Sequence, residues 1–193
     1  EITIVTGVQT CALPISKAVP LALIEQTRHD PLKINLITGA SLGRGLDGMM
    51  AEAGLLARRM PFQGDAVLRK AINEGKVMFI DQHLSEVVEQ LRDGYLPTPD
   101  IAVIEAVCIT EQGHIVPTSS VGNSATLALA AKQIIIELNL ASSPHFEGLH
   151  DIYQPQNRPH RGPIPVLQSN NRIGSHAIEI DPSRIAAIVI CNT

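Results

Sequence analysis

Two loops made largely of small and hydroxyl-bearing residues offer the clearest chemistry in this sequence. The first, residues 118–124, comes just before a run of strong helix formers at residues 125–133. Backbone N–H groups and the positive end of the helix dipole would meet at such a loop, and they suit a carboxylate or a phosphate. Ser120, Asn123 and Ser124 are also the residue types that cap a helix, and the loop by itself favours that simpler interpretation.

The second loop, residues 39–48, holds four glycines in ten residues and follows a predicted strand at residues 33–38. Its spacing matches neither the dinucleotide-binding fingerprint nor a phosphate loop that ends in Lys-Ser or Lys-Thr. Four glycines still indicate a chain that turns tightly or lets a ligand approach its backbone. Tight packing and a place in the wall of an active site are both compatible with this pattern.

Other reactive side chains lack the spacing of a catalytic or metal site. His145, His150 and His160 occur at irregular intervals, which does not predict a metal site. Cys108 and Cys191 show neither metal-ligand nor redox spacing, and each is typical of a small core residue.

Strands and helices are expected to alternate along the chain and to place the two loops at strand ends. The central strand is residues 101–109, an apolar run rich in β-branched residues. Further strands are predicted at residues 33–38, 76–80, 134–139, 177–181 and 185–190, and helices at residues 17–30, 49–58, 66–75, 81–94 and 125–133. Residues 58–65 are expected to form a loop, and residues 141–171 a long surface excursion. This order predicts an α/β fold with an open, mostly parallel sheet flanked by helices.

Composition limits the class of protein. The chain has 193 residues, enough for one domain with a substantial core, and 45% of them are hydrophobic but only 3% aromatic. An aliphatic core of this kind fits strands covered by helices better than a β-sandwich. The formal net charge of −4 gives no basic face for nucleic acid. No apolar run approaches the roughly 18 residues that span a bilayer, so a cytoplasmic location is the default expectation.

Both ends of the chain need separate treatment. Residues 5–15 look like the translation of a sequencing-library adapter, so residues 1–16 are treated as non-native and left out of the fold prediction. A native strand at residues 2–5 and a secretory signal are the competing readings, and the signal lacks a basic start. The chain is also expected to continue past Thr193, because a parallel pattern should not end on a buried strand without a covering helix.

Nine short motifs occur along the chain in one order, and together they carry a family resemblance. The motifs are residues 37–41 (ITGAS), 68–75 (LRKAINEG), 81–85 (DQHLS), 104–106 (IEA), 109–113 (ITEQG), 121–124 (VGNS), 135–139 (IIELN), 149–152 (LHDI) and 171–174 (NRIG). This set resembles the N-terminal domain of the acetyl-CoA hydrolase / acetate (succinate) CoA-transferase family. The resemblance extends over residues 17–192, and it identifies residues 17–193 as that domain without its C-terminal partner.

The resemblance implies two similar open α/β domains with the active site between them. It also implies covalent catalysis, in which a glutamate attacks an acyl-CoA thioester and becomes a glutamyl-CoA thioester by way of an anhydride. In a transferase, acetate or succinate then takes the CoA from this intermediate. In a hydrolase, water takes the place of that carboxylate. Coenzyme A and acetyl-CoA are substrates, no cofactor is permanently bound, and a homodimer is implied. The family's glutamate lies in the C-terminal domain, so no catalytic residue is expected here, and Glu105 matches a different motif.

Two groups of residues are expected to face the cleft, since ligands of open α/β sheets bind beyond strand ends. They are Gly39, Ala40 and Ser41 after one strand, and Ser120, Val121, Gly122 and Asn123 after another. Met60, Pro61 and Phe62 are expected to line the acyl or pantetheine channel. The family pattern has a Tyr near Phe62 and a Ser near Gly64, and this departure leaves the substrate preference open.

Two other functions remain as alternatives. One is a non-catalytic α/β module that binds an anion through the glycine-rich loop. The other is a sugar-phosphate isomerase of related fold, which needs a phosphate clamp beside acid–base carboxylates that cannot be placed here. Transferase and hydrolase activity are not distinguished by these residues.

Overall fold

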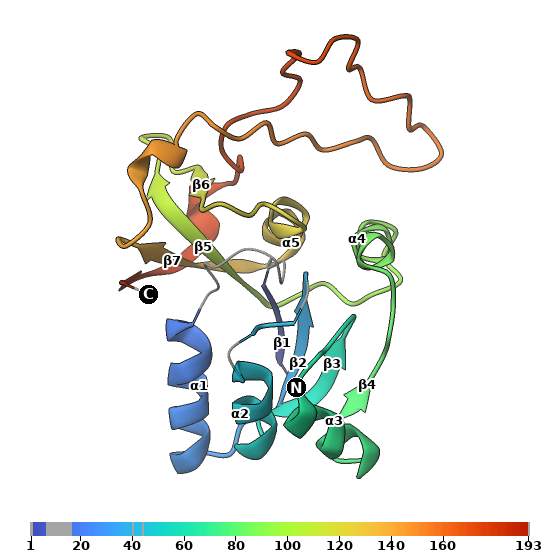
Figure 1. Ribbon diagram of the computed structural model, residues 1–193, viewed down its shortest axis with the longest axis vertical. Coiled ribbons are helices and arrows are strands. Elements are labelled where there is room, and N and C mark those ends of the chain that lie inside the picture. The colour runs from blue at the N-terminus through green and yellow to red at the C-terminus, as the bar shows by residue number, and fades with distance from the viewer. Residues whose placement is uncertain (1, 7–16, 40, 44, 193) are drawn as a thin grey trace.

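The computed structural model describes residues 2–6, 17–39, 41–43 and 45–192 of the chain. They form an eight-stranded sheet in the order β4-β3-β2-β1-β5-β7-β8, with β6 paired to β5 (Figure 1). The strands are β1 (Ile2–Thr6), β2 (Ile34–Thr38), β3 (Leu56–Met60), β4 (Met78–Phe79), β5 (Ile101–Ile109), β6 (Ile115–Pro117), β7 (Gln133–Asn139) and β8 (Ile185–Cys191). The helices are α1 (Ala18–His29), α2 (Leu46–Glu52), α3 (Ala66–Asn73), α4 (Leu84–Arg92) and α5 (Ser124–Ala130), with short 3₁₀ turns at Pro144–Phe146 and Pro182–Arg184.

The sheet is parallel at every described pairing except that of β5 with β6. The predicted α/β fold with an open, mostly parallel sheet is therefore confirmed. Within the described residues, no helix is long and apolar enough to cross a membrane.

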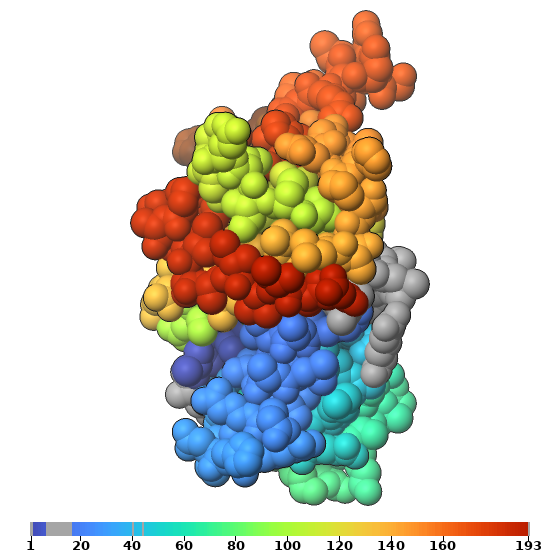
Figure 2. Space-filling model, turned by 90° about the vertical axis from the view of Figure 1, so that its left-hand side faces the viewer, coloured from blue at the N-terminus to red at the C-terminus, as the bar shows by residue number. Residues whose placement is uncertain are grey.

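Successive residues of the inner strands place their side chains alternately in two hydrophobic cores, one on each face of the sheet. Leu36 packs in the core that includes residues of α1, α2 and α3, whereas its neighbour Ile37 packs in the core beneath α4 and α5. Val103 and Ile104 of β5 divide in the same way. This arrangement explains why the inner strands read as continuous apolar runs, because both of their faces are covered. Figure 2 shows the last strand, β8, crossing the molecule next to α1.

The first strand, β1, lies in the middle of the sheet. It pairs in parallel with β2 from Ile2↔Ile34 to Thr6↔Thr38, and with β5 beginning at Ile4↔Ile101. Leaving residues 1–16 out of the fold therefore omits a central strand. The non-native origin of this segment stays a prediction, and residues 7–16 lie outside the described residues.

Residues 49–52 are helical and residues 61–65 form a loop as predicted, but the element types predicted for residues 53–60 are wrong. α2 ends at Glu52, Gly54 takes a φ of 71°, and β3 follows where the sequence suggests the end of a helix and then a loop. A left-handed glycine of this kind is a common helix stop. Leu56 is only 1% exposed, since β3 fills the place between β2 and β4. Burial in the sheet overrides the helix propensity of these residues.

Residues 153–174 form a long extension, named the arm here, which projects beyond α4 and α5 (Figure 1). Its two ends meet at an antiparallel bridge between Ile152 and Ser175, with N···O distances of 2.7 and 3.0 Å. The arm occupies the greater part of the predicted surface excursion. Residues 177–181, predicted as a strand, contribute only a single bridge from Ile178 to Ile115.

Gly174 is expected to be essential to the base of the arm. A Cβ at this position would overlap the carbonyl oxygen of Ile152, whereas a Cβ at Gly162, farther out in the arm, would meet nothing within 4 Å. Gly174→Ala should therefore lower the thermal midpoint by about 2–4 °C or more and speed proteolytic cleavage of the arm. Gly162→Ala is the matched control and should leave both unchanged. Equal behaviour of the two variants would contradict this account of the arm's base.

Candidate functional site

The loop after β2 is held in place by a buried carboxylate. Asp47, at the start of α2 and 1% exposed, accepts hydrogen bonds from the Ser41 hydroxyl and the Leu42 N–H, both at 2.9 Å. Its other oxygen accepts from Arg59 Nε at 2.9 Å. The Arg59 side chain comes from β3, is fully buried and also donates to the Met60 carbonyl at 2.6 Å. A single ion pair thus fastens the glycine-rich loop to the neighbouring strand.

Three glycines allow the loop to take this course. Gly43 and Gly45 have φ values of 61° and 73°, a left-handed conformation that costs other residues free energy. Gly48 lies so close to Asp65 that a Cβ would come within 2.6 Å of that carboxylate. Asp65 in turn caps α3 by accepting from the Val67 and Leu68 N–H groups. The glycines therefore serve both tight turning and close packing of α2 against α3.

A cleft of about 410 Å³ opens beyond the carboxyl ends of β2 and β3. Its lining residues are Ser41, Gly43, Gly45, Asp47, Phe62, Gly64 and Asp65. This is the sheet edge where open α/β proteins place their ligands. The cleft combines a hydroxyl group, two carboxylates that are already hydrogen-bonded, and the half-exposed ring of Phe62.

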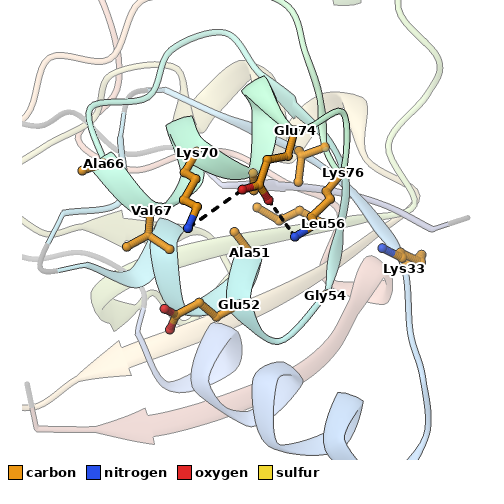
Figure 3. A pocket seen from close by; sticks show the side chains of 12 residues that line it. Lys33, Ala51, Glu52, Gly54, Leu56, Ala66, Val67, Lys70, Glu74 and Lys76 are labelled. Atoms are coloured by element: carbon orange, nitrogen blue, oxygen red, sulfur yellow. Dashed lines mark ion pairs between the residues drawn. The ribbon is translucent and has the colours of Figure 1, made fainter.

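A larger groove of about 650 Å³ lies between α2 and α3, with residues from the amino ends of β2 and β3 at its base (Figure 3). Its charges are partly paired, since Glu74 lies 2.7 Å from Lys76 and 3.9 Å from Lys70. The Lys76 ammonium holds the pKa of Glu74 below its usual range. This groove reaches the end of the strands opposite to the ligand-binding edge, so the smaller cleft is the better candidate site.

The second predicted loop leads into α5 without capping it through Asn123. That side chain makes no cap hydrogen bond and instead donates to the Leu84 carbonyl of α4 at 3.4 Å. Gly122 is exposed with a φ of 46°, and Ser120 and Val121 are partly exposed. The capping interpretation therefore does not account for Asn123.

The structure brings together only part of the predicted set. Ser41 and Phe62 line the 410 Å³ cleft, whereas Gly39, Met60, Pro61 and residues 120–123 are not among its lining residues. Ala40 lies outside the described residues. A role for either loop in binding substrate stays a prediction.

Two buried glutamates on adjacent strands form a feature that the sequence reasoning missed. Glu105 of β5 and Glu137 of β7 are register partners and are 8% and 0% exposed. The Glu137 carboxylate accepts hydrogen bonds from backbone N–H groups at the start of α1, from Lys17 at 2.8 Å and from Val19 at 2.7 Å. The signal was available, because each glutamate interrupts an apolar run that was predicted to be a buried strand.

Burial raises the pKa of Glu105 to about 7, against the hydrogen bond that it accepts from Asn139 Nδ2 at 2.6 Å. The nearby charge of Glu137 contributes to this rise of the Glu105 pKa. Burial also raises the pKa of Glu137, and the N–H donors of α1 oppose that change. Glu105 therefore changes protonation close to neutral pH, while Glu137 anchors the first helix to the sheet.

Comparison with known proteins gives the family. The sequence profile described as "Acetyl-CoA hydrolase/transferase N-terminal domain" matches residues 2–190. The chain belongs to the acetyl-CoA hydrolase/transferase family. The resemblance noted in the sequence is thereby confirmed, and the chain corresponds to the N-terminal domain of that family.

Relatives within the family include both activities. The chain is 41% identical to a succinyl-CoA:acetate CoA-transferase of Clostridium kluyveri over 92% of its own length and 33% of the relative's. It is 42% identical to an acetyl-CoA hydrolase of Schizosaccharomyces pombe over 90% of its length and 35% of that protein. A solved 4-hydroxybutyrate CoA-transferase of Porphyromonas gingivalis shares the fold, with a TM-score of 0.52 at 19% identity over 99% of this chain and 35% of that one. The chain thus spans about a third of the length of each of these proteins.

Removing the buried carboxylate of Asp47 should lower the free energy of unfolding more than removing an exposed carboxylate. Asp47→Ala leaves the Arg59 guanidinium buried and unpaired, which costs about 3–5 kcal/mol of unfolding free energy. Glu25→Ala is the control, because Glu25 pairs with Arg28 on the exposed face of α1 and should cost under about 0.5 kcal/mol. Urea unfolding measures both. Losses of similar size would contradict the role given to the Asp47–Arg59 pair.

Glu105 should make stability depend on pH. Its pKa is about 7 in the folded chain against 4.5 for an ordinary glutamate, so the folded state binds more protons between those values. The free energy of unfolding therefore falls as the pH rises from about 4.5 to about 7. Glu105→Gln removes this dependence, and its stability relative to the parent should rise by about 1–3 kcal/mol between about pH 5 and pH 8. Urea unfolding at both pH values tests this, with the exposed Glu179→Gln as control. An equal gain at both pH values would count against the assignment.

Proposed function

We propose that this chain is the N-terminal domain of an acyl-CoA:carboxylate CoA-transferase or an acetyl-CoA hydrolase. The observation that carries the proposal is the family match over residues 2–190, supported by relatives of both activities at 41–42% identity. Because the chain spans about a third of those relatives, the activity belongs to the full-length protein. The chain alone supplies one wall of the active site and is inactive.

The catalytic glutamate of this proposal lies in the C-terminal part. Its carboxylate oxygen attacks the thioester carbonyl, the C–S bond breaks, and CoA leaves as a thiolate while an anhydride forms. The thiolate then attacks the glutamyl carbonyl of the anhydride, which releases the first carboxylate and leaves a glutamyl-CoA thioester. In a transferase, an acceptor such as acetate or succinate takes the CoA by the reverse steps. In a hydrolase, water cleaves the thioester.

The residues of this chain serve to bind and position substrate. The backbone around Gly39, Ala40 and Ser41 and around residues 120–123 is a candidate for holding the substrate carboxylate or a developing oxyanion, through N–H groups other than that of Gly39, which donates to the Thr6 carbonyl at 3.1 Å. The Ser41 hydroxyl is oriented by Asp47 at 2.9 Å, and Phe62 offers an apolar wall to the acyl or pantetheine chain. Substrates of the proposed enzyme are acetyl-CoA or succinyl-CoA with a small carboxylate, and a homodimer is part of the proposal.

The test is an assay of the full-length protein beside the 193-residue chain. The full-length protein should exchange CoA between acetyl-CoA and succinate, or hydrolyse acetyl-CoA, and should accumulate a glutamyl thioester that borohydride reduces. The 193-residue chain should do neither. Thioester turnover by the 193-residue chain would contradict the proposal that this chain alone is inactive. A full-length protein without thioester chemistry would contradict the proposed function.

Ser41 is expected to matter for substrate binding. In the full-length protein, Ser41→Ala should lower kcat/KM about tenfold through loss of one hydrogen bond to the substrate. Ser85→Ala, on an exposed position of α4, is the control and should leave kcat/KM unchanged. An unchanged kcat/KM in Ser41→Ala would remove this cleft from the active-site wall.

A further inference from the structure

The arm, residues 153–174, projects from the body of the domain (Figures 1 and 2), and it carries apolar side chains that are exposed to solvent. Ile164, Val166 and Leu167 are 60%, 50% and 92% exposed. A cluster of large aliphatic side chains on a projecting segment is typical of a surface that another polypeptide covers.

The outgoing limb of the arm is fastened to α4. Arg161 donates to both carboxylate oxygens of Glu89, at 2.8 and 2.9 Å, and Arg158 lies 3.3 Å from the same carboxylate. Arg92 donates to the Pro155 carbonyl. The three arginines hold the pKa of Glu89 below its usual range, with Arg161 contributing most. One acidic side chain thus fixes the direction in which this limb leaves the domain.

The returning limb is fastened as well. Arg172 donates to the carbonyls of Gly148 and His150, at 2.9 and 3.2 Å, and the Asp151 carboxylate accepts the Gly174 N–H at 2.7 Å. Near the tip, the Asn171 side chain accepts from the N–H groups of Leu167 and Gln168 at 3.0 and 2.9 Å. Both limbs are thus anchored to the domain, and the apolar side chains between them are exposed.

The backbone of the apolar part of the arm, residues 163–167, is also conformationally restricted, which favours binding to a partner surface. Pro163 and Pro165 flank Ile164, and each proline fixes its own φ and restricts the residue before it. A segment stiffened in this way loses less conformational entropy on docking than a flexible loop. The arm therefore has the properties of a recognition segment.

The base of the arm adjoins the second predicted substrate loop. Gln154 Oε1 accepts from the Thr126 hydroxyl of α5 at 3.2 Å, and α5 begins immediately after residues 120–123. A cleft of about 540 Å³ separates α5 from the base of the arm, lined on one side by Ala125 and Leu129. A partner bound to the arm would thus lie next to residues 120–123, the loop that precedes α5.

We propose that the arm docks on the C-terminal part of the full-length polypeptide, with the side chains of Ile164, Val166 and Leu167 buried in an apolar recess there. This inference rests on the proposed function, because the family match is to an N-terminal domain and the chain spans 33–35% of the relatives described above. In the proposed full-length enzyme, the remaining part of the polypeptide packs against this domain and completes the active site. No carboxylate occurs in residues 152–178, and their three arginines outnumber the single carboxylate, Glu89, with which Arg158 and Arg161 pair, so a complementary surface around the recess would be acidic.

Hydrogen exchange of the amides of Ile164, Val166 and Leu167 tests this docking. In the full-length protein they should exchange about 100-fold more slowly than in the 193-residue chain, independently of protein concentration. In the full-length protein, Leu167→Asp should abolish this protection. Leu21→Asp is the control, because Leu21 is a 44% exposed residue on α1, and the arm should stay protected in it.

The possible results distinguish failure of the docking proposal from failure of the proposed function. A full-length protein that turns over thioesters while these amides exchange as fast as in the 193-residue chain would overturn the docking proposal and leave the function standing. Protection that appears in the 193-residue chain as its concentration rises would also overturn it, since a second copy would then be the occupant. Protection in a full-length protein without thioester chemistry would support docking and defeat only the function.

Discussion

The buried ion pair between Asp47 and Arg59 is the constraint on which the candidate site depends. Both side chains are sealed from solvent, so neither charge can be left without its partner. The same carboxylate also receives the Ser41 hydroxyl and the Leu42 N–H. The path of the loop after β2 therefore depends on Arg59 of the neighbouring strand β3 as well as on Asp47 and the glycines within the loop.

The parallel topology then decides where chemistry can occur. The carboxyl ends of parallel strands meet at one sheet edge, and the loop at residues 39–48 follows β2 at this edge. Residues 118–124 instead follow β6, which runs antiparallel to β5. The cleft near Ser41 and Phe62 lies at this edge. The second loop lies apart from that cleft, beside α4 and the base of the arm, and is connected to α4 through Asn123. Two separate surfaces on one wall suit a site that a second part of the protein completes.

Two carboxylates buried in the sheet differ in the hydrogen-bond donors that surround them. Glu137 is satisfied by the free N–H groups at the start of α1, which supply the donors that a buried carboxylate requires. Glu105 lacks such a set, and burial raises its pKa to about 7. The difference shows how the same residue type, at paired positions of adjacent strands, becomes an anchor in one place and a titrating group in the other.

The sequence by itself determined the fold class, most of the strands and helices, and the family, because apolar periodicity and short ordered motifs are local properties of the chain. It did not determine β3, since residues 55–58 have the helix propensity of their neighbours and become a strand only between β2 and β4. It also gave no sign that Arg59 would be buried against Asp47, or that Glu105 would lie opposite Glu137. Those pairings depend on strand order and register, which bring together residues distant in sequence, and only the tertiary structure decides them.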